Sequence, residues 1–551
     1  MLVATLVACG DKVPSRTPAK IFFADTASEA GINFRHFNGF SGHYYYYETF
    51  GSGAAFFDFD EDGWLDIYLV NGAVLTDTLP ANLPVNRLYR NETSDKIKSG
   101  SQVPLRFRDI TTNSGTNDNH YGMGVAAADF DNDGFQDLYV TNAGPNLLLR
   151  NQRGSGQFTD VTDQFGVGDE RWGTSCAFLD YDSDGDLDLF VVNYVHFDRR
   201  NNPSCKQGKH RSYCEPDTYD PVEDILYRND NSHFLDVTHA SGITLSGRGL
   251  GVALADYDRD GDTDIYVAND GTMNFLYENQ LGSFIENGLY AGGRYNADGL
   301  PEAGMGVDFG DVQNDGWQDL YVTNFTNETN TLYINDGENQ LHDQTQQFEL
   351  GGPSLQPLGF GTKFFDYDND GFLDLFVANG HVMDIIAKVK PELTYAQPNQ
   401  IFRNLEGIRF SETSQELGKG LEIVGVSRAT AMADCDNDGD MDVLVTNISG
   451  APTLLRNEGG NQNNWLLVEL VGLTHKDAFG ARVTVTTNDQ HMLREKQSGA
   501  SYLSSHDPRL HFGLGQSKSA HIEIVWPGGH IQIIEDVSAN QILRIKEAQQ
   551  G

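Results

Sequence analysis

The sequence predicts an all-β fold: a seven-bladed β-propeller followed by a C-terminal β-sandwich-like domain. An aspartate-rich loop of nine residues, first seen as DFDEDGWLD from Asp58 to Asp66, occurs seven times. Each loop lies between short apolar segments, and four such segments recur in each unit, the pattern of a propeller blade. From about residue 463 the loop disappears, and alternating strands with Gly turns indicate a separate β domain.

The spacing inside each loop predicts a calcium site. Side-chain oxygens at positions 1, 3, 5 and 9 and the backbone carbonyl of position 7 suit Ca²⁺, and Gly at position 6 permits the sharp turn. Carboxylates crowded this closely repel one another unless a cation lies among them. The expected ligands, in chain order, are Asp58, Asp60, Asp62, Trp64 and Asp66; Asp129, Asp131, Asp133, Phe135 and Asp137; Asp180, Asp182, Asp184, Asp186 and Asp188; Asp256, Asp258, Asp260, Asp262 and Asp264; Asp311, Gln313, Asp315, Trp317 and Asp319; Asp366, Asp368, Asp370, Phe372 and Asp374; and Asp434, Asp436, Asp438, Asp440 and Asp442. We expect up to seven structural Ca²⁺ ions, with the weakest site at the fifth loop, where Gln313 replaces an aspartate.

An EF-hand and a plain turn both fit the loops less well than this ion site. An EF-hand needs a bidentate Glu at position 12, which here is Leu69 in the first loop and Val in the other six. Plain Asp/Gly turns between strands account for one or two copies, but not for the same spacing seven times. The loops are therefore interpreted as ion sites between the first two strands of each blade.

The other strands of each unit predict how the ring closes. The third strand resembles NRLYRN (Asn86 to Asn91), and the fourth resembles FRDIT, which begins at Phe107. The seventh unit lacks its fourth strand, whereas an unassigned strand FFADTA begins at Phe22. We expect this N-terminal strand to complete the last blade, so that residues 20–460 form a ring without a free sheet edge.

Loops between the second and third strands lie on the face opposite the calcium loops, and three of them are long. The insertion in the third unit carries a basic group comprising Arg199, Arg200, Lys206, Lys209, His210 and Arg211. In an acidic protein this group can receive an anionic glycan or an acidic partner loop. The alternative is internal pairing with Glu215, Asp217, Asp220 and neighbouring acidic residues. We expect a protein or glycan partner at this face, since recognition commonly uses such loops.

Net charge and cysteine usage limit the function classes. A formal charge of -41 argues against nucleic-acid binding, which needs clustered Lys and Arg. Cys205 and Cys214 lie in one polar insertion and are a candidate disulfide, whereas Cys176 and Cys435 lie in or beside predicted strands as core thiols. No apolar run of membrane-spanning length occurs.

The first 19 residues are interpreted as the remnant of a signal sequence and a linker. Leu6-Val7-Ala8-Cys9 has the form of a bacterial lipobox, which makes Cys9 a candidate lipidation site, although the preceding apolar run is short and lacks a basic region. The membrane contact expected is this lipid anchor alone. The predicted location is extracytoplasmic: periplasmic, outer-membrane lipoprotein or secreted.

The segment from residue 463 to 547 resembles the ASPIC/UnbV domain through GARVTV, SGASYLSSHDPRLHFGLG and IEIVWPGG. It departs from the family at THKDAFGARV, where an Asn-rich turn is commoner. The repeats resemble the FG-GAP or VCBS repeats of integrin α-chain propellers. Together the two regions resemble the cartilage acidic protein-like family, which implies a calcium-bound propeller and an extracytoplasmic location but no particular reaction.

The function predicted from the sequence is a calcium-stabilised scaffold for adhesion, envelope assembly or ligand capture. The alternative is a lyase or hydrolase acting on an acidic polysaccharide, using residues among His196, His210, Arg211, Tyr213, His381, His506, Asp507 and His511. No P-loop, G-x-S-x-G or H-E-x-x-H motif is present, so no catalytic residue and no organic cofactor is assigned. The sequence does not indicate an oligomeric state.

Overall fold

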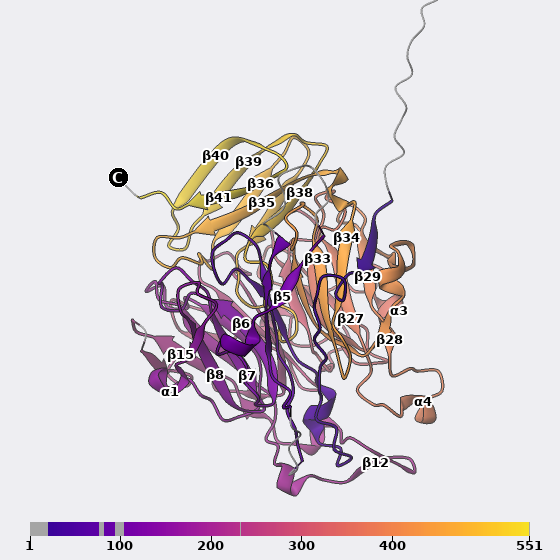
Figure 1. Ribbon diagram of the computed structural model, residues 1–551. Helices are drawn as coiled ribbons and strands as arrows, with labels where there is room; N and C mark the ends of the chain where they lie inside the picture. The colour runs from indigo at the N-terminus through magenta and orange to yellow at the C-terminus, as the bar shows by residue number, and fades with distance from the viewer. Residues whose placement is uncertain (1–19, 77–81, 94–103, 232, 550–551) are drawn as a thin grey trace, which may run out of the picture.

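A computed structural model describes residues 20–76, 82–93, 104–231 and 233–549. Cys9 and the rest of residues 1–19 lie outside the described residues, so the candidate lipobox stays a prediction. Most of the regular secondary structure of the described chain is β-strand, and a smaller C-terminal body lies on top of a larger group of sheets (Figure 1). The all-β prediction is confirmed.

Seven antiparallel sheets of four strands each form the ring. The first three contain β2 (Ala54–Phe57), β3 (Asp66–Leu69), β4 (Arg87–Asn91) and β5 (Phe107–Asp109); β6 (Gly122–Ala128), β7 (Asp137–Asn142), β8 (Gly144–Asn151) and β9 (Phe158–Asp160); and β10 (Gly173–Leu179), β11 (Asp188–Asn193), β15 (Ile225–Asn229) and β16 (Phe234–Asp236). The next two contain β18 (Gly249–Ala255), β19 (Asp264–Asn269), β20 (Phe275–Asn279) and β21 (Phe284–Glu286); and β22 (Val307–Gly310), β23 (Asp319–Val322), β24 (Thr331–Asn335) and β25 (Leu341–Asp343).

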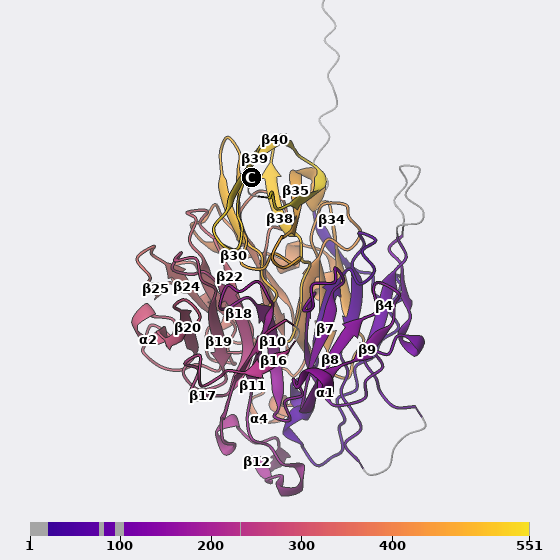
Figure 2. The ribbon, with the colours of Figure 1, turned by 90° about the vertical axis from the view of Figure 1, so that its left-hand side faces the viewer.

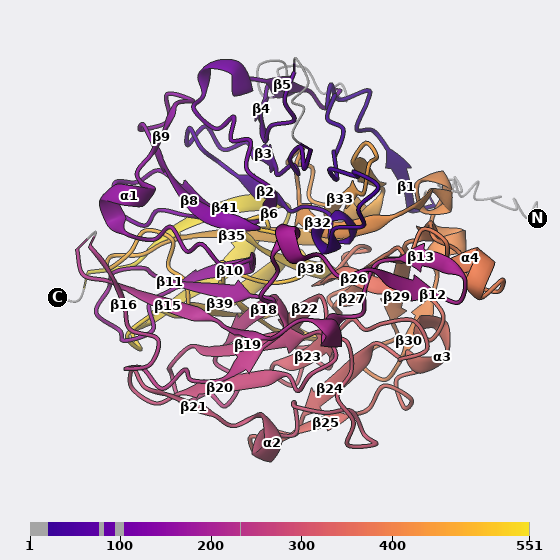
Figure 3. The same cartoon turned by 90° about the horizontal axis from the view of Figure 1, so that it is seen from below.

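The sixth sheet contains β26 (Gly359–Phe365), β27 (Asp374–Asn379), β29 (Gln400–Asn404) and β30 (Phe410–Glu412). The seventh contains β32 (Ser427–Ala433), β33 (Asp442–Asn447), β34 (Thr453–Glu458) and, as its outer strand, β1 (Phe22–Asp25). The innermost strands contact one another in the order β2, β6, β10, β18, β22, β26, β32 and again β2 (Figure 3). The sheets are thus the blades of a closed ring.

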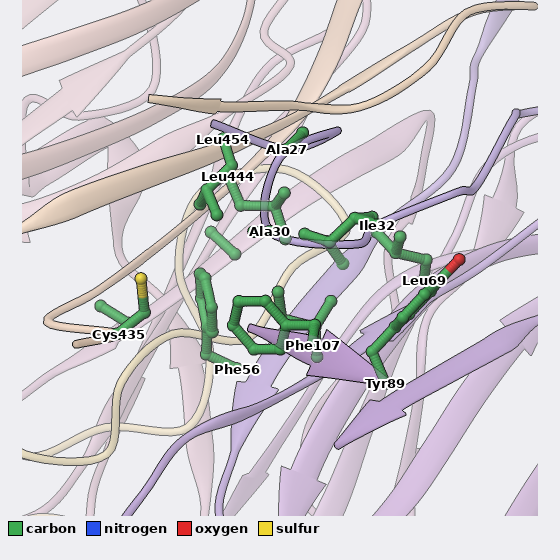
Figure 4. Packing of buried hydrophobic residues seen from close by; sticks show 14 of the residues in the cluster. Ala27, Ala30, Ile32, Phe56, Leu69, Tyr89, Phe107, Cys435, Leu444 and Leu454 are labelled. Atoms are coloured by element: carbon green, nitrogen blue, oxygen red, sulfur yellow. The ribbon is translucent and has the colours of Figure 1, made fainter. Parts of the chain in front are cut away.

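The predicted closure by the N-terminal strand is present. In β1, Phe22 pairs with Glu458 and Asp25 pairs with Leu455, both in β34. Residues just after β1 then pack between the seventh and first blades: Ala27, Ala30 and Ile32 meet Phe107 of the first blade and Leu444 of the seventh (Figure 4). Because these side chains are almost fully buried, the two ends of the propeller share one hydrophobic core.

Short helices and two-stranded sheets lie in the loops that connect the strands of the ring. The helices are α1 (Thr162–Phe165), α2 (Gly288–Ala291), α3 (Gly351–Ser354) and α4 (Ile386–Val389), with the 3₁₀ turn η1 at Tyr46–Thr49 among others. Two-stranded sheets pair β12 (Cys205–Gln207) with β13 (His210–Ser212), β14 (Val222–Glu223) with β17 (Ser246–Gly247), and β28 (Gln397–Pro398) with β31 (Val424–Gly425). The β12–β13 hairpin and α4 project from the face opposite the C-terminal body (Figure 2).

The C-terminal body is the predicted two-sheet domain. One sheet orders β38 (Leu510–Gly515), β35 (Asn464–Val471) and β41 (Gln541–Lys546); the other orders β37 (His491–Glu495), β36 (Arg482–Thr486), β39 (Ser519–Val525) and β40 (Ile531–Ser538). Alternate residues of both sheets, including Val468, Val483, Phe512 and Trp526, form its core.

Residues 498–507 of this domain enter the centre of the propeller. Ser501 exchanges two backbone hydrogen bonds with Val307 of the fifth blade, and Ser505 does the same with the first blade. Other hydrogen bonds join this segment to the second, third, sixth and seventh blades. A Cβ on Gly53 would lie 1.9 Å from the carbonyl oxygen of Leu503, which explains why the first blade places Gly beside its innermost strand.

Candidate metal centre

The seven acidic loops share one backbone conformation. Each joins the first two strands of a blade, and all seven residues at position 4 have positive φ, from Asn314 at 54° to Arg259 at 63°. The Gly that follows at position 6 also has positive φ, from 86° at Gly63 to 102° at Gly261. The repeated turn chemistry therefore folds each copy in the same way.

Backbone N–H groups hold the first and ninth carboxylates. Oδ2 of the first aspartate accepts a hydrogen bond from the Gly at position 6 in every loop, at 2.8 Å for Asp58 and Gly63. Oδ1 of the ninth aspartate accepts one from the backbone of an Asn at or next to the end of the third strand, at 2.8 Å for Asp66 and Asn91. Two of the predicted ligands in each loop are thus fixed before any ion binds.

The same Asn also joins neighbouring blades, a role that was not predicted from the sequence. Its side-chain amide donates to the carbonyl of the second loop residue in the preceding blade, as Asn151 does to Phe59 and Asn335 does to Tyr257. All seven blades show this bond, including Asn91 to Cys435 across the closure of the ring. The signal in the sequence was the Asn that ends every LYRN-like segment.

The carboxylates gather as a metal site requires. In at least five loops, oxygens of three carboxylates lie within 4.8 Å of one another: Asp58, Asp60 and Asp62; Asp129, Asp131 and Asp137; Asp180, Asp182 and Asp188; Asp256, Asp258 and Asp260; and Asp366, Asp368 and Asp374. Several buried carboxylate oxygens have no hydrogen-bond partner in the described chain: Asp60 Oδ1, Asp137 Oδ2, Asp182 Oδ1, Asp256 Oδ1 and Asp436 Oδ1. Buried acceptors without a donor cost free energy, and oxygen-only clusters suit a hard cation.

The pKa values and ion pairs of the loop carboxylates also favour a bound cation. Burial raises the pKa of Asp58, Asp129 and Asp180 to about 7, and neighbouring carboxylates add to the effect. Four loops are partly neutralised by the Arg of the third strand, as in the 2.6 Å contact of Arg90 Nη2 with Asp60 Oδ2. In the fifth blade Gln313 leaves three loop carboxylates, the fewest of the seven loops, and Ile334 replaces the neutralising Arg.

The C-terminal domain covers this acidic face. Arg482 Nη1 lies 2.6 Å from Asp256 Oδ2 of the fourth loop, and Arg509 Nη2 donates to the carbonyl of Asp434 in the seventh at 2.8 Å. Gln490 donates to the carbonyl of Asp370 in the sixth loop, and Arg544 pairs with Glu61 in the first. The C-terminal domain thus occupies the acidic face of the propeller.

The opposite face carries the insertions, as predicted. Cys205 and Cys214, the candidate disulfide, are bonded in the structure and tie the β12–β13 hairpin to the following turn. Arg211 donates to the backbone carbonyls of Gly42 and His43, and Arg200 pairs with Asp198. Of the predicted basic group, Arg199, Lys206 and Lys209 are exposed, and no ion pair with Glu215, Asp217 or Asp220 occurs among the described residues.

The candidate catalytic residues do not form one site. His506, Asp507 and His511 lie between the propeller and the C-terminal domain, where burial lowers the pKa of His511 to about 3. Tyr213 and His381 line a different cavity, and burial lowers the pKa of His381 to about 4. His196 and Arg211 are exposed. His506 Nδ1 accepts a hydrogen bond from the backbone of Met432, and Asp507 pairs with Arg509.

The fold and its loops define a repeat propeller with acidic clusters that could hold metal ions. The chain belongs to the FG-GAP-like repeat family, whose model matches residues 58–140, 129–191, 218–267, 256–322 and 311–377, together more than half of the chain. The ASPIC and UnbV model matches residues 472–551. The family resemblance expected from the sequence is confirmed.

The curated relatives include cartilage acidic protein 1 from Mus musculus, which is 26% identical over 520 residues, or 90% of this chain and 73% of that protein. The protein of the same name from Homo sapiens is 25% identical over 522 residues, covering 90% and 71%. Similar solved structures include an Agrocybe aegerita lectin that recognises non-reducing terminal N-acetylglucosamine, with a TM-score of 0.36 and 14% identity over 66% of this chain and 79% of that one. A Bacillus licheniformis rhamnogalacturonan lyase has a TM-score of 0.36 and 11% identity over 73% and 71%. Likeness at this level supports no functional argument.

Proposed function

We propose that this protein is a calcium-stabilised extracytoplasmic scaffold that binds a protein or glycan partner through the propeller face opposite the acidic loops. The observation that carries the proposal is the difference between the two faces of the propeller. The acidic face is covered by the C-terminal domain, whereas the opposite face bears the disulfide-tied hairpin and its exposed basic side chains. Recognition on loops held by a rigid ring fits this arrangement.

Calcium would be held by the aspartates at positions 1, 3, 5 and 9 of the loops. When bound, the ion would neutralise the crowded carboxylates and connect the first two strands of each blade. The loop backbones and the seven Asn side chains then keep the blades in register. The intact disulfide supports an oxidising compartment. Among the described residues, no helix is both long and apolar enough to cross a bilayer.

The test is capture of defined extracellular material on the immobilised full chain, in calcium and in chelator. The double variant Arg199→Ser/Lys209→Ser removes two exposed charges from the third-blade insertion, and Lys518→Ser/Lys546→Ser removes two from the C-terminal domain as a matched control. We expect acidic glycans or proteins to be retained in calcium and lost in chelator. Retention in calcium should be weaker with the Arg199→Ser/Lys209→Ser variant and unchanged with the control variant. Equal retention by all three proteins would contradict the proposal.

A further inference from the structure

A cavity of about 400 Å³ opens on the face that carries the insertions. Its lining comes from inner strands, through Leu250 of β18 and Phe360 of β26, and from the two insertions of the third and sixth blades. Those insertions approach each other from distant parts of the ring, and β12, β13 and α4 lie close together (Figure 3). A cavity of this size is typical of small-ligand sites.

Most of the lining is apolar. Phe50, Met305, Phe360 and Leu393 contribute hydrocarbon surface, and all four side chains are largely buried. The segment 498–507 does not line the cavity; Tyr502 instead packs edge-on against Phe360, with ring centroids 5.1 Å apart. The aromatic wall formed by Phe360 is therefore backed by the ring of Tyr502.

Two opposite charges lie within this apolar lining. Asp270 is 8% exposed, and its Oδ2 accepts a hydrogen bond from the hydroxyl of Tyr194, which in turn bonds to Tyr46 at 3.0 Å. Arg248 donates from Nη2 to the carbonyl of Tyr219, whereas its buried Nε has no hydrogen-bond partner in the described chain. No ion pair joins Asp270 to Arg248 among the described residues. Burial raises the pKa of Asp270 to about 6, and the nearby charge of Arg248 opposes part of that rise.

A second acid of the lining, Glu328, is held by backbone hydrogen bonds. Oε2 of Glu328 accepts hydrogen bonds from the backbone of Ala303 at 2.9 Å and of Phe325 at 3.3 Å. The remaining charged lining residues, Glu215, Asp217 and Lys390, are exposed at the rim. Besides Glu328, the interior therefore presents the carboxylate of Asp270 and the guanidinium of Arg248, which form no ion pair in the described chain, beside an apolar chamber. A ligand that carries both charges on a small apolar body complements this arrangement.

We propose that this cavity binds a free apolar α-amino acid, with the ammonium group at Asp270 and the carboxylate at Arg248. The amino-acid side chain occupies the apolar part of the cavity beside Phe50, Met305 and Phe360. None of the exposed basic side chains of the hairpin lines the cavity, so this site goes beyond the proposed partner binding and does not depend on it.

The test uses the full chain in calcium and four probes: L-phenylalanine, L-leucine, phenethylamine and 3-phenylpropionate, measured by calorimetry and ligand-observed NMR. We expect L-phenylalanine or L-leucine to bind at least tenfold more tightly than either singly charged analogue. Asp270→Asn, which keeps an acceptor for Tyr194, should remove this advantage over 3-phenylpropionate. Arg248→Gln should remove the advantage over phenethylamine.

Filling the cavity gives an independent test. Met305 and Val389 both line the cavity, and replacing either with Trp should abolish binding of the amino acids. Leu289→Trp, on the outer α2 helix, should leave binding unchanged. Two cavity variants are used so that misfolding of one does not decide the result. The proposal is overturned if neither amino acid binds at millimolar concentration, if the singly charged analogues bind as tightly, or if a folded cavity variant binds normally.

Discussion

Asp477 of the C-terminal domain accepts a hydrogen bond at 2.7 Å from the backbone N–H of Asp129, the first residue of the second acidic loop. Its other oxygen accepts from the side chain of Gln136, which precedes the ninth residue of the same loop. The C-terminal domain therefore contacts the backbone of an acidic loop directly, and Asp477 couples the conformation of that loop to the docking of the domain.

Replacing Asp477 tests this contact. Asp477→Ala leaves the buried N–H of Asp129 without an acceptor, which should lower the free energy of unfolding by about 1 to 3 kcal/mol. Asp477→Asn keeps an acceptor oxygen and should cost less. Urea titration followed by fluorescence measures both, and equal losses in the two variants would show that the hydrogen bond is not what stabilises the interface.

The Asn bridge between blades gives a second prediction. Asn335→Ala removes the side-chain donor to the carbonyls of Tyr257 and Gln318, two buried residues of the fourth and fifth acidic loops. We expect a loss of about 2 to 4 kcal/mol, since two buried acceptors lose their partner. Gln340→Ala, at an exposed position of the same blade, is the control and should change stability by less than about 0.5 kcal/mol.

The buried carboxyl group of Asp224 should make the stability of the protein depend on pH. It takes the place of the Asn found at this point in other blades, and its Oδ1 accepts from the backbone of Asn193 as Asn86 Oδ1 does from Asn71. Burial raises the pKa of Asp224 to about 7 from an ordinary value of 3.8. Between these values the folded protein holds a proton that the unfolded chain has released, so stability falls as pH rises.

Asp224→Asn removes this titration. The variant should match the wild type near pH 4 and be more stable by about 1 to 4 kcal/mol at pH 8. Thermal unfolding at the two pH values measures the difference. A variant that is less stable than the wild type at pH 8 would contradict the assigned direction.

The fifth loop tests the ligand assignment. Gln313→Asp adds a fourth carboxylate to a loop that also lacks the third-strand Arg, so calcium affinity at this site should rise at least tenfold. The reciprocal change Asp131→Gln should weaken the second loop. Calcium titration by calorimetry compares both with the wild type, and unchanged isotherms would show that position 3 is not a ligand.

The sequence predicted the parts of the fold that repeat. Seven equal spacings identified the loops, and the missing strand of the last unit, together with Phe22 near the N-terminus, indicated closure of the ring. The position of the C-terminal domain could not be predicted, because contacts such as Asp477 with Asp129 or Ser501 with Val307 join segments without any shared pattern. The cavity was missed for the same reason: Asp270, Met305 and Phe360 come from different blades and meet only in three dimensions.

The most direct test of the calcium-stabilised scaffold is the calcium content of the purified protein together with its melting temperature before and after chelation. We predict several bound Ca²⁺ ions per chain, at most seven, and a melting temperature that falls by many degrees when they are removed and returns when calcium is restored. A protein whose calcium has been completely removed, as shown by metal analysis, and whose melting temperature is unchanged would contradict the account.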